Sequence, residues 1–167
     1  PGMREKILIQ SKCGICKGHY NASYEHIMEA VEGSLKRLGV EQMDVLLLHR
    51  PDALMEPEEV AAAFDRLYTD GKVRYFGVSN ENSGQMALLQ KYVKQHLIAN
   101  QLQFGPAHTI LVDEGMNVNI HSAHASQCGG SILDYCRLND VTIQAWSPFQ
   151  HGMFEGPFQL SEKYEKL

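Results

Sequence analysis

The stretch SLKRLGVEQMDVLLLHRPD, residues Ser34–Asp52, decides the fold class, because it joins the end of an amphipathic helix to a fully apolar strand. The helical side chains form one apolar stripe at helical spacing: Ile27, Val31, Leu35 and Leu38. Gly39 follows the stripe, where a helix ends on a left-handed residue. Asp44–His49, DVLLLH, is nearly all apolar, which is typical of a parallel strand covered on both faces.

The same alternation of strand and helix continues in both directions. Strands are expected at Lys6–Gln10, Asp44–His49, Val73–Val78, Leu97–Phe104 and Val141–Trp146. Alternation with short connections predicts a parallel sheet with helical crossovers, an α/β fold.

The helices between these strands carry their own start and stop signals. One helix is expected to begin at Pro57, since proline suits the first helical position, and to end at Gly71. Ser83 is the expected cap of the next, whose apolar face holds Met86, Leu89 and Val93. A last helix is expected at Ile132–Leu138.

Composition excludes several classes of function. The chain has 167 residues with 44% apolar and 21% charged side chains, which suits one globular domain over residues 1–167. A net charge of -5 gives no basic surface for nucleic acid. No apolar run approaches the roughly 20 residues needed to cross a membrane. The four cysteines are too few for a disulfide scaffold, so a reducing cytoplasm is the expected location.

Polar residues gather at the carboxyl ends of the expected strands. They are Lys12, His49, Ser79, Asn80, Gln101, Trp146 and Ser147. Parallel α/β folds place their active sites at that edge of the sheet. Two connections are long, residues 13–21 and 106–130, and loops of that length in a compact domain are usually functional or disordered.

At this point the sequence resembles the aldo-keto reductases. Besides the opening stretch, four further blocks match that family in its order: SKCGI from Ser11, GKVRYFGVSN from Gly71, ANQLQFGP from Ala99 and QAWSPFQ from Gln144. The last block is similar to a bacterial branch of oxidoreductases. The resemblance implies a (β/α)8 TIM barrel, represented here by about five β/α units. Since a complete barrel takes about 250 residues, we expect one barrel domain that is incomplete at both ends.

The resemblance also implies an activity, the reduction of aldehydes and ketones to alcohols with a nicotinamide cofactor, NADP(H) rather than NAD(H). Lys12 and His49 match the family's catalytic lysine and histidine. Ser79, Asn80 and Gln101 match its contacts to the nicotinamide amide, and Trp146 matches the aromatic residue stacked on the ring. The start of the pyrophosphate-binding loop is matched by Ser147, Phe149 and Gln150.

The family's catalytic tyrosine and aspartate have no counterpart in this sequence by the same register. Tyr20 and Tyr24 follow Lys12 and do not fit the position of the proton donor. We therefore expect residues 1–167 alone to be a very poor reductase, since loss of general acid catalysis costs about 10²–10⁴ in rate. We expect the long connection 106–130 to form a wall or lid of the substrate site. The expected binding partner is the substrate, a small carbonyl compound.

Two other interpretations stay open. A barrel without its proton donor could bind a nicotinamide cofactor as a regulatory subunit without catalysis. Alternatively, two groups of residues have spacing suited to zinc ligands. The first is Cys13, Cys16 and His19, and the second is His121, His124 and Cys128. A single C-x-x-C is a weak signal, and Cys13 already belongs to a family block, so no metal is expected.

Overall fold

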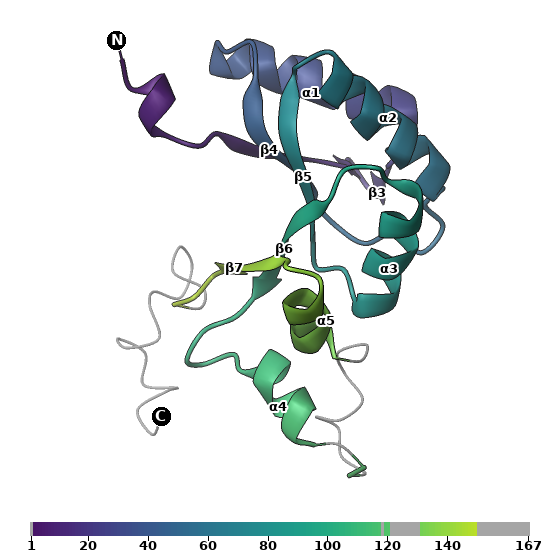
Figure 1. Cartoon of the computed structure of the whole chain (residues 1–167), viewed down its shortest axis with the longest axis vertical. Helices are drawn as coiled ribbons and strands as arrows, with labels where there is room; N and C mark the ends of the chain where they lie inside the picture. Colours follow the sequence, from purple (N-terminus) through teal and green to yellow (C-terminus); the bar gives the residue numbers. More distant parts are fainter. Residues whose placement is uncertain (1, 118, 121–130, 150–167) are drawn as a thin grey trace. The chain divides into compact units, whose positions relative to one another are not determined.

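The computed structural model describes residues 2–117, 119–120 and 131–149 (Figure 1). Its elements form two compact units, Pro1–Asn100 and Gln101–Leu167. The first unit contains a 3-10 turn Arg4–Lys6, β1 (Gln10–Cys13), β2 (Ile15–Cys16), β3 (His19–Tyr20), α1 (Tyr24–Leu38), β4 (Met43–Leu48), α2 (Pro57–Thr69), β5 (Val73–Ser79) and α3 (Ser83–Tyr92). Strand β6 (Leu97–Gln103) leads into the second unit, which contains α4 (Ile110–Met116), α5 (Ile132–Leu138) and β7 (Thr142–Trp146).

Strand β4 is the centre of the first unit. The sheet has the strand order β1-β4-β5-β6-β7, and β4 pairs in parallel with both β1 and β5. All six residues of Met43–Leu48 are buried, as the apolar run predicts. The expected α/β alternation with parallel strands is therefore confirmed for this unit.

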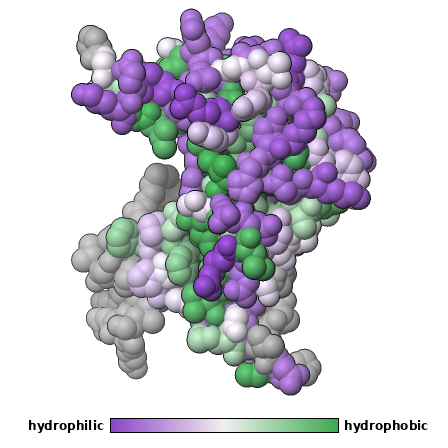
Figure 2. Space-filling model, in the orientation of Figure 1, coloured by the Kyte–Doolittle hydropathy of each residue, from purple (hydrophilic) through white to green (hydrophobic). Residues whose placement is uncertain are grey.

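Capping residues set the boundaries of helices α1 and α2. The Ser23 hydroxyl accepts a hydrogen bond from the His26 N–H at 3.3 Å, and Gly39, with φ of 66°, ends α1 as predicted. Pro57 occupies the first turn of α2. Phe64 of α2 stacks on Phe76 of β5 with ring centroids 4.2 Å apart, which fixes this helix on the sheet. The part of the molecular face that carries α1 and α2 is mostly hydrophilic (Figure 2).

Two predictions about local structure were wrong. The first strand is Gln10–Cys13 and not Lys6–Gln10, and Ile7 and Leu8 are 46% and 75% exposed. Their apolar side chains favoured a strand. In the structure, however, the Ile9 N–H donates a hydrogen bond to the Asp44 carboxylate at 2.8 Å, and the register of β1 with β4 begins at Gln10. The cap of α3 is Asn82, which forms a reciprocal capping box with Gln85, and Ser83 is the first helical residue.

The two long connections contain regular structure. The segment after β1 forms the short antiparallel hairpin of β2 and β3. The connection 106–130 contains α4, and its residues 118 and 121–130 lie outside the described part of the chain. In the second unit, the backbone of Gly105 passes so close to Pro148 that an added Cβ would lie 2.3 Å from the Pro148 carbonyl oxygen. Within the described residues, no helix is both long and apolar enough to cross a membrane.

Candidate functional site

Lys12, His49 and Ser79 lie at the carboxyl ends of three neighbouring parallel strands. Lys12 is in register with Leu47, two residues before His49 on β4. The backbone N–H of His49 donates to the Cys13 carbonyl at 2.9 Å, which fixes the position of His49 beside the end of β1. On the other side, Leu48 is in register with Val78, so the next residues, His49 and Ser79, also lie at one level. The structure thus brings these three predicted residues to one edge of the sheet.

Burial and two nearby positive charges act on the imidazole of His49. Burial lowers the pKa of His49 first, and the nearby charges of Lys12 and Arg50 lower it further. Burial, followed by the charge of Arg50, also lowers the pKa of Lys12. The His49 ring is therefore neutral at neutral pH, and one of its nitrogens carries a proton that can be donated to a ligand oxygen.

Ser79 and Asn80 form a polar turn where β5 ends. Ser79 is 1% exposed, and the Asn80 side-chain amide donates to its hydroxyl at 2.9 Å. Asn80 has a φ of 62°, in the left-handed region that asparagine tolerates better than most residues. This turn places a hydroxyl and an amide group beside the carboxyl end of β4.

The predicted cofactor-binding residues of the second unit lie on β6, on β7 and directly after β7. The Gln101 side-chain amide donates to the Gln144 side-chain oxygen at 3.2 Å, which links β6 to β7. Trp146 is half-buried at the last position of β7, and Ser147 follows it with a φ of 45°. Phe149 is 54% exposed. Gln150 lies outside the described residues.

Three further polar residues, two just after strand ends and one inside β6, were not predicted from the sequence. Arg50 acts electrostatically on both Lys12 and His49. Glu81, directly after the Ser79–Asn80 turn, is 2% exposed, and Asn100 of β6 is fully buried. An asparagine inside an apolar strand was a usable signal for Asn100. A charged residue between a strand and a helix, by contrast, ordinarily indicates an exposed connection.

The cysteine and histidine groups do not form a metal site in the described residues. Across residues 2–117, 119–120 and 131–149, no three His, Cys, Asp or Glu side chains are arranged to hold a metal ion. Cys13 is buried and its thiol lies 3.8 Å from the Leu47 carbonyl, while Cys16 lies 3.7 Å from the His26 ring. The second predicted group, His121, His124 and Cys128, lies outside the described residues.

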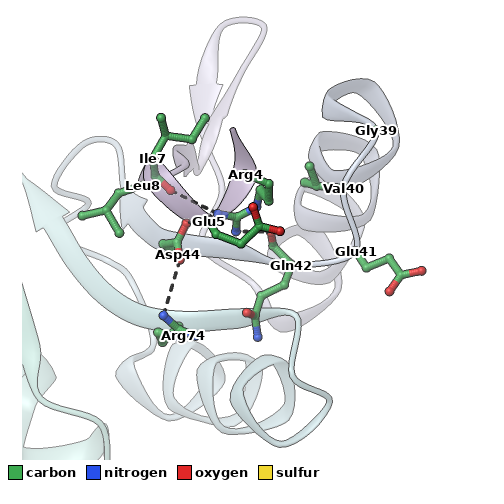
Figure 3. A pocket seen from close by; sticks show the side chains of 10 residues that line it. All are labelled: Arg4, Glu5, Ile7, Leu8, Gly39, Val40, Glu41, Gln42, Asp44 and Arg74. Atoms are coloured by element: carbon green, nitrogen blue, oxygen red, sulfur yellow. Dashed lines mark hydrogen bonds and ion pairs between the residues drawn. The ribbon is translucent and has the colours of Figure 1, made fainter. Parts of the chain in front are cut away.

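A cavity of about 650 Å³ lies at the opposite, amino end of β4 (Figure 3). Its wall includes a network in which the Asp44 carboxylate pairs with Arg4 at 2.9 Å and with Arg74 at 3.8 Å. Arg4 also donates to the Gln42 carbonyl at 3.0 Å. The charges of Arg4, Asp44 and Arg74 are thus paired with one another, and the contacts of Arg4 hold the segment before β1 against β4.

Comparison with known proteins identifies the family. The sequence profile of the aldo/keto reductase family matches residues 1–166. The chain belongs to this family. Aldo/keto reductase structures share its fold: the thermostable aldo-keto reductase Tm1743 matches with a TM-score of 0.68 and 25% identity, over 96% of this chain and 49% of that one. The expected fold is thus confirmed as part of a TIM barrel.

Curated relatives of this aldo/keto reductase chain are oxidoreductases. It is 44% identical over 153 residues to oxidoreductase YdhF of Escherichia coli (strain K12), covering 86% of this chain and 51% of YdhF. It is 37% identical over 162 residues to uncharacterized oxidoreductase YcsN of Bacillus subtilis (strain 168), covering 91% of this chain and 49% of YcsN. A 6-dehydroglucose reductase of Agrobacterium fabrum (strain C58 / ATCC 33970) is 34% identical, with 95% of this chain and 52% of that protein covered. The chain spans about half the length of these relatives.

Proposed function

We propose that the full-length protein to which this chain belongs reduces an aldehyde or ketone to an alcohol with a nicotinamide cofactor, NADP(H) in preference to NAD(H). The observation that carries the proposal is the common position of Lys12, His49 and Ser79 at the carboxyl ends of β1, β4 and β5. Membership of the aldo/keto reductase family supports oxidoreductase chemistry at this edge.

The reaction requires a group that binds the carbonyl oxygen and stabilises the negative charge that develops there. The neutral His49 ring can donate a hydrogen bond to this oxygen, because its lowered pKa keeps one nitrogen protonated and uncharged. Lys12 supplies a neighbouring positive charge. In the proposed mechanism this charge favours the ionised form of the proton-donating tyrosine, which by the family resemblance is not among residues 1–167.

The Ser79–Asn80 turn has chemistry that fits the amide of a nicotinamide ring. A carboxamide offers both donors and an acceptor, and the Ser79 hydroxyl and Asn80 amide supply the complementary groups. When bound, the cofactor supplies the hydride for the carbonyl carbon. The roles of Gln101, Trp146, Ser147, Phe149 and Gln150 in cofactor binding remain predictions from the family resemblance.

The test is a reduction assay on the full-length protein with Lys12→Met. Oxidation of NADPH is followed by absorbance with a panel of small aldehydes, and the rate is expected to fall by about 10²–10⁴. Lys17→Met is the matched control, because Lys17 is an exposed lysine in the hairpin after β1. Turnover within a few-fold of wild type in the Lys12 variant would contradict the role proposed for Lys12.

A fluorescence titration of the same protein with the cofactor separates catalysis from binding alone. Fluorescence of Trp146, the single tryptophan of this chain, reports cofactor binding if the ring stacks there as the resemblance implies. Binding without turnover of any carbonyl would favour a regulatory or binding barrel. Failure to bind either NADPH or NADH would exclude both functions.

A further inference from the structure

Glu81 is a buried acid that the proposed mechanism does not use. It directly follows the Ser79–Asn80 turn, and only 2% of its surface is exposed. Its side-chain oxygen Oε1 is fully buried and has no hydrogen-bond partner among the described residues. An ionised carboxylate is costly there, because Oε1 has lost its hydrating water without gaining a donor.

The neighbours of Glu81 favour its protonated form. Burial raises the pKa of Glu81 to about 7, and the negative charge of Asp52, from the connection after β4, contributes in the same direction. Strand β6 contributes the uncharged Asn100, and α3 contributes Met86, whose sulfur accepts from the Asn100 amide at 3.2 Å. Asn100 Oδ1 is also buried and lacks a donor within the described part of the chain. A proton on Glu81 removes this buried negative charge and its repulsion with Asp52.

The backbone of Glu81 is fixed to the sheet. The Asn100 side-chain amide donates to the Glu81 carbonyl at 2.8 Å, so β6 holds the residue that ends the turn. Asn80, one residue earlier, is already in the left-handed conformation, which leaves the turn few alternative paths. A movement of Glu81 toward water on ionisation would therefore displace Ser79 and Asn80 as well.

We propose that Glu81 is a positioning residue: as an uncharged acid it holds the Ser79–Asn80 turn in its binding geometry, and its ionisation weakens nicotinamide binding. This inference rests on the proposed function, because it assumes that the turn contacts the nicotinamide amide. Glu81 itself touches neither substrate nor cofactor in this proposal.

The test is the pH dependence of the dissociation constant for NADH, measured by fluorescence titration of the full-length protein and of Glu81→Gln. Glutamine has the size of the protonated acid and cannot ionise. When only the protonated form binds, the wild-type dissociation constant rises about fivefold from pH 7 to pH 8. Lys12, His49 and the ligand titrate equally in both proteins. The ratio of the wild-type to the Glu81→Gln dissociation constant therefore isolates the effect of Glu81.

A second variant tests the direction of the effect. Asp52→Asn removes the like charge that helps to raise the pKa of Glu81, so binding should begin to weaken at a lower pH than in wild type. The Leu54 N–H donates to Asp52 Oδ1 at 2.9 Å, and an asparagine oxygen can accept the same bond, so the connection is preserved.

The outcomes are distinguishable. The inference is supported if the ratio of the wild-type to the Glu81→Gln dissociation constant rises about fivefold from pH 7 to pH 8, and if the profile shifts to lower pH in Asp52→Asn. Equal pH dependence in wild type and Glu81→Gln would overturn it while leaving the proposed function intact. Absence of NADH and NADPH binding by every protein at every pH would overturn the proposed function and the inference together.

Discussion

The backbone N–H of His49 and the carbonyl of Cys13 are joined by a 2.9 Å hydrogen bond that continues the β1–β4 pairing beyond the end of β4. This bond sets His49 beside the strand that carries Lys12. The electrostatic influence of Lys12 on His49 follows from that placement. The character of His49 as a neutral donor thus depends on strand register as well as on its own burial.

Substitution of Arg50 should raise the pKa of His49. Burial is the main cause of the lowered pKa, and Lys12 and Arg50 add to it, so Arg50→Gln should move the value part of the way back toward 6.5. The measurement is a pH titration of the His49 ring by NMR. Arg66→Gln, which removes an equal charge from α2, is the control and should leave His49 unchanged. An unchanged His49 titration in Arg50→Gln would show that Arg50 is too well screened to act.

Gly77 permits the close approach of β5 and β6, and its replacement should destabilise the protein. A Cβ at Gly77 would lie 2.5 Å from the Ala99 carbonyl oxygen and 2.8 Å from the Leu47 side chain. We expect Gly77→Ala to cost about 1–3 kcal/mol in the free energy of unfolding, measured with urea.

Gly33→Ala is the matched control for the Gly77 substitution. Gly33 is in the interior of α1, and its added Cβ would meet only the flexible end of the Arg37 side chain, at 3.0 Å. Alanine should therefore stabilise the helix by about 0.5–1 kcal/mol. Equal effects of the two substitutions would argue against a tight β5–β6 approach.

Asp44 should contribute to stability at neutral pH and lose that contribution in acid. The Ile9 N–H, followed by Arg4 and Arg74, holds the pKa of Asp44 below its usual value against the opposing effect of burial. A lowered pKa means that the contribution is complete above the ordinary pKa of about 3.9 and disappears as the pH falls through the lower, folded value.

The corresponding variant is Asp44→Asn, measured by urea unfolding at neutral and acidic pH. We expect a loss of about 1.5–3 kcal/mol at neutral pH, because a charged acceptor of the Ile9 N–H is replaced by a neutral one. Asp65→Asn, at an exposed pair with Lys94, is the control and should have a smaller effect. An Asp44→Asn loss that persists undiminished below pH 3 would contradict the charge-based explanation.

The sequence predicts the parts of this fold that depend on local pattern, and fails where distant residues decide. The apolar run of β4 and the Gly39 signal are local, and both predictions are confirmed. The start of β1 depends on Asp44, 35 residues from Ile9, so the apolar Ile7 and Leu8 were misleading. Lys12 and His49 could be selected because strand ends and a family resemblance coincide. Burial of Glu81 depends on contacts with β6, which no local pattern around residue 81 reveals.

Glu81→Gln should stabilise the protein, and the gain should depend on pH. Burial raises the pKa of Glu81 from 4.5 to about 7. Below pH 4.5 the acid is protonated in folded and unfolded chains, so it costs nothing. Between these two values the unfolded chain ionises first, and the folded state loses stability as the pH rises. Above the folded value the cost is complete, at most about 3 kcal/mol.

Urea unfolding of wild type and Glu81→Gln across this pH range measures that cost directly. The difference between the two proteins should be near zero at low pH and grow until about pH 7. Glu29→Gln, at an exposed position of α1, is the control and should show no such growth. A difference that stays constant with pH would mean that Glu81 has the same pKa in the folded and unfolded chains. Glu81 would then be ionised in the folded protein at neutral pH, with its charge met by a donor. That result would also remove the physical basis for its action on the Ser79–Asn80 turn.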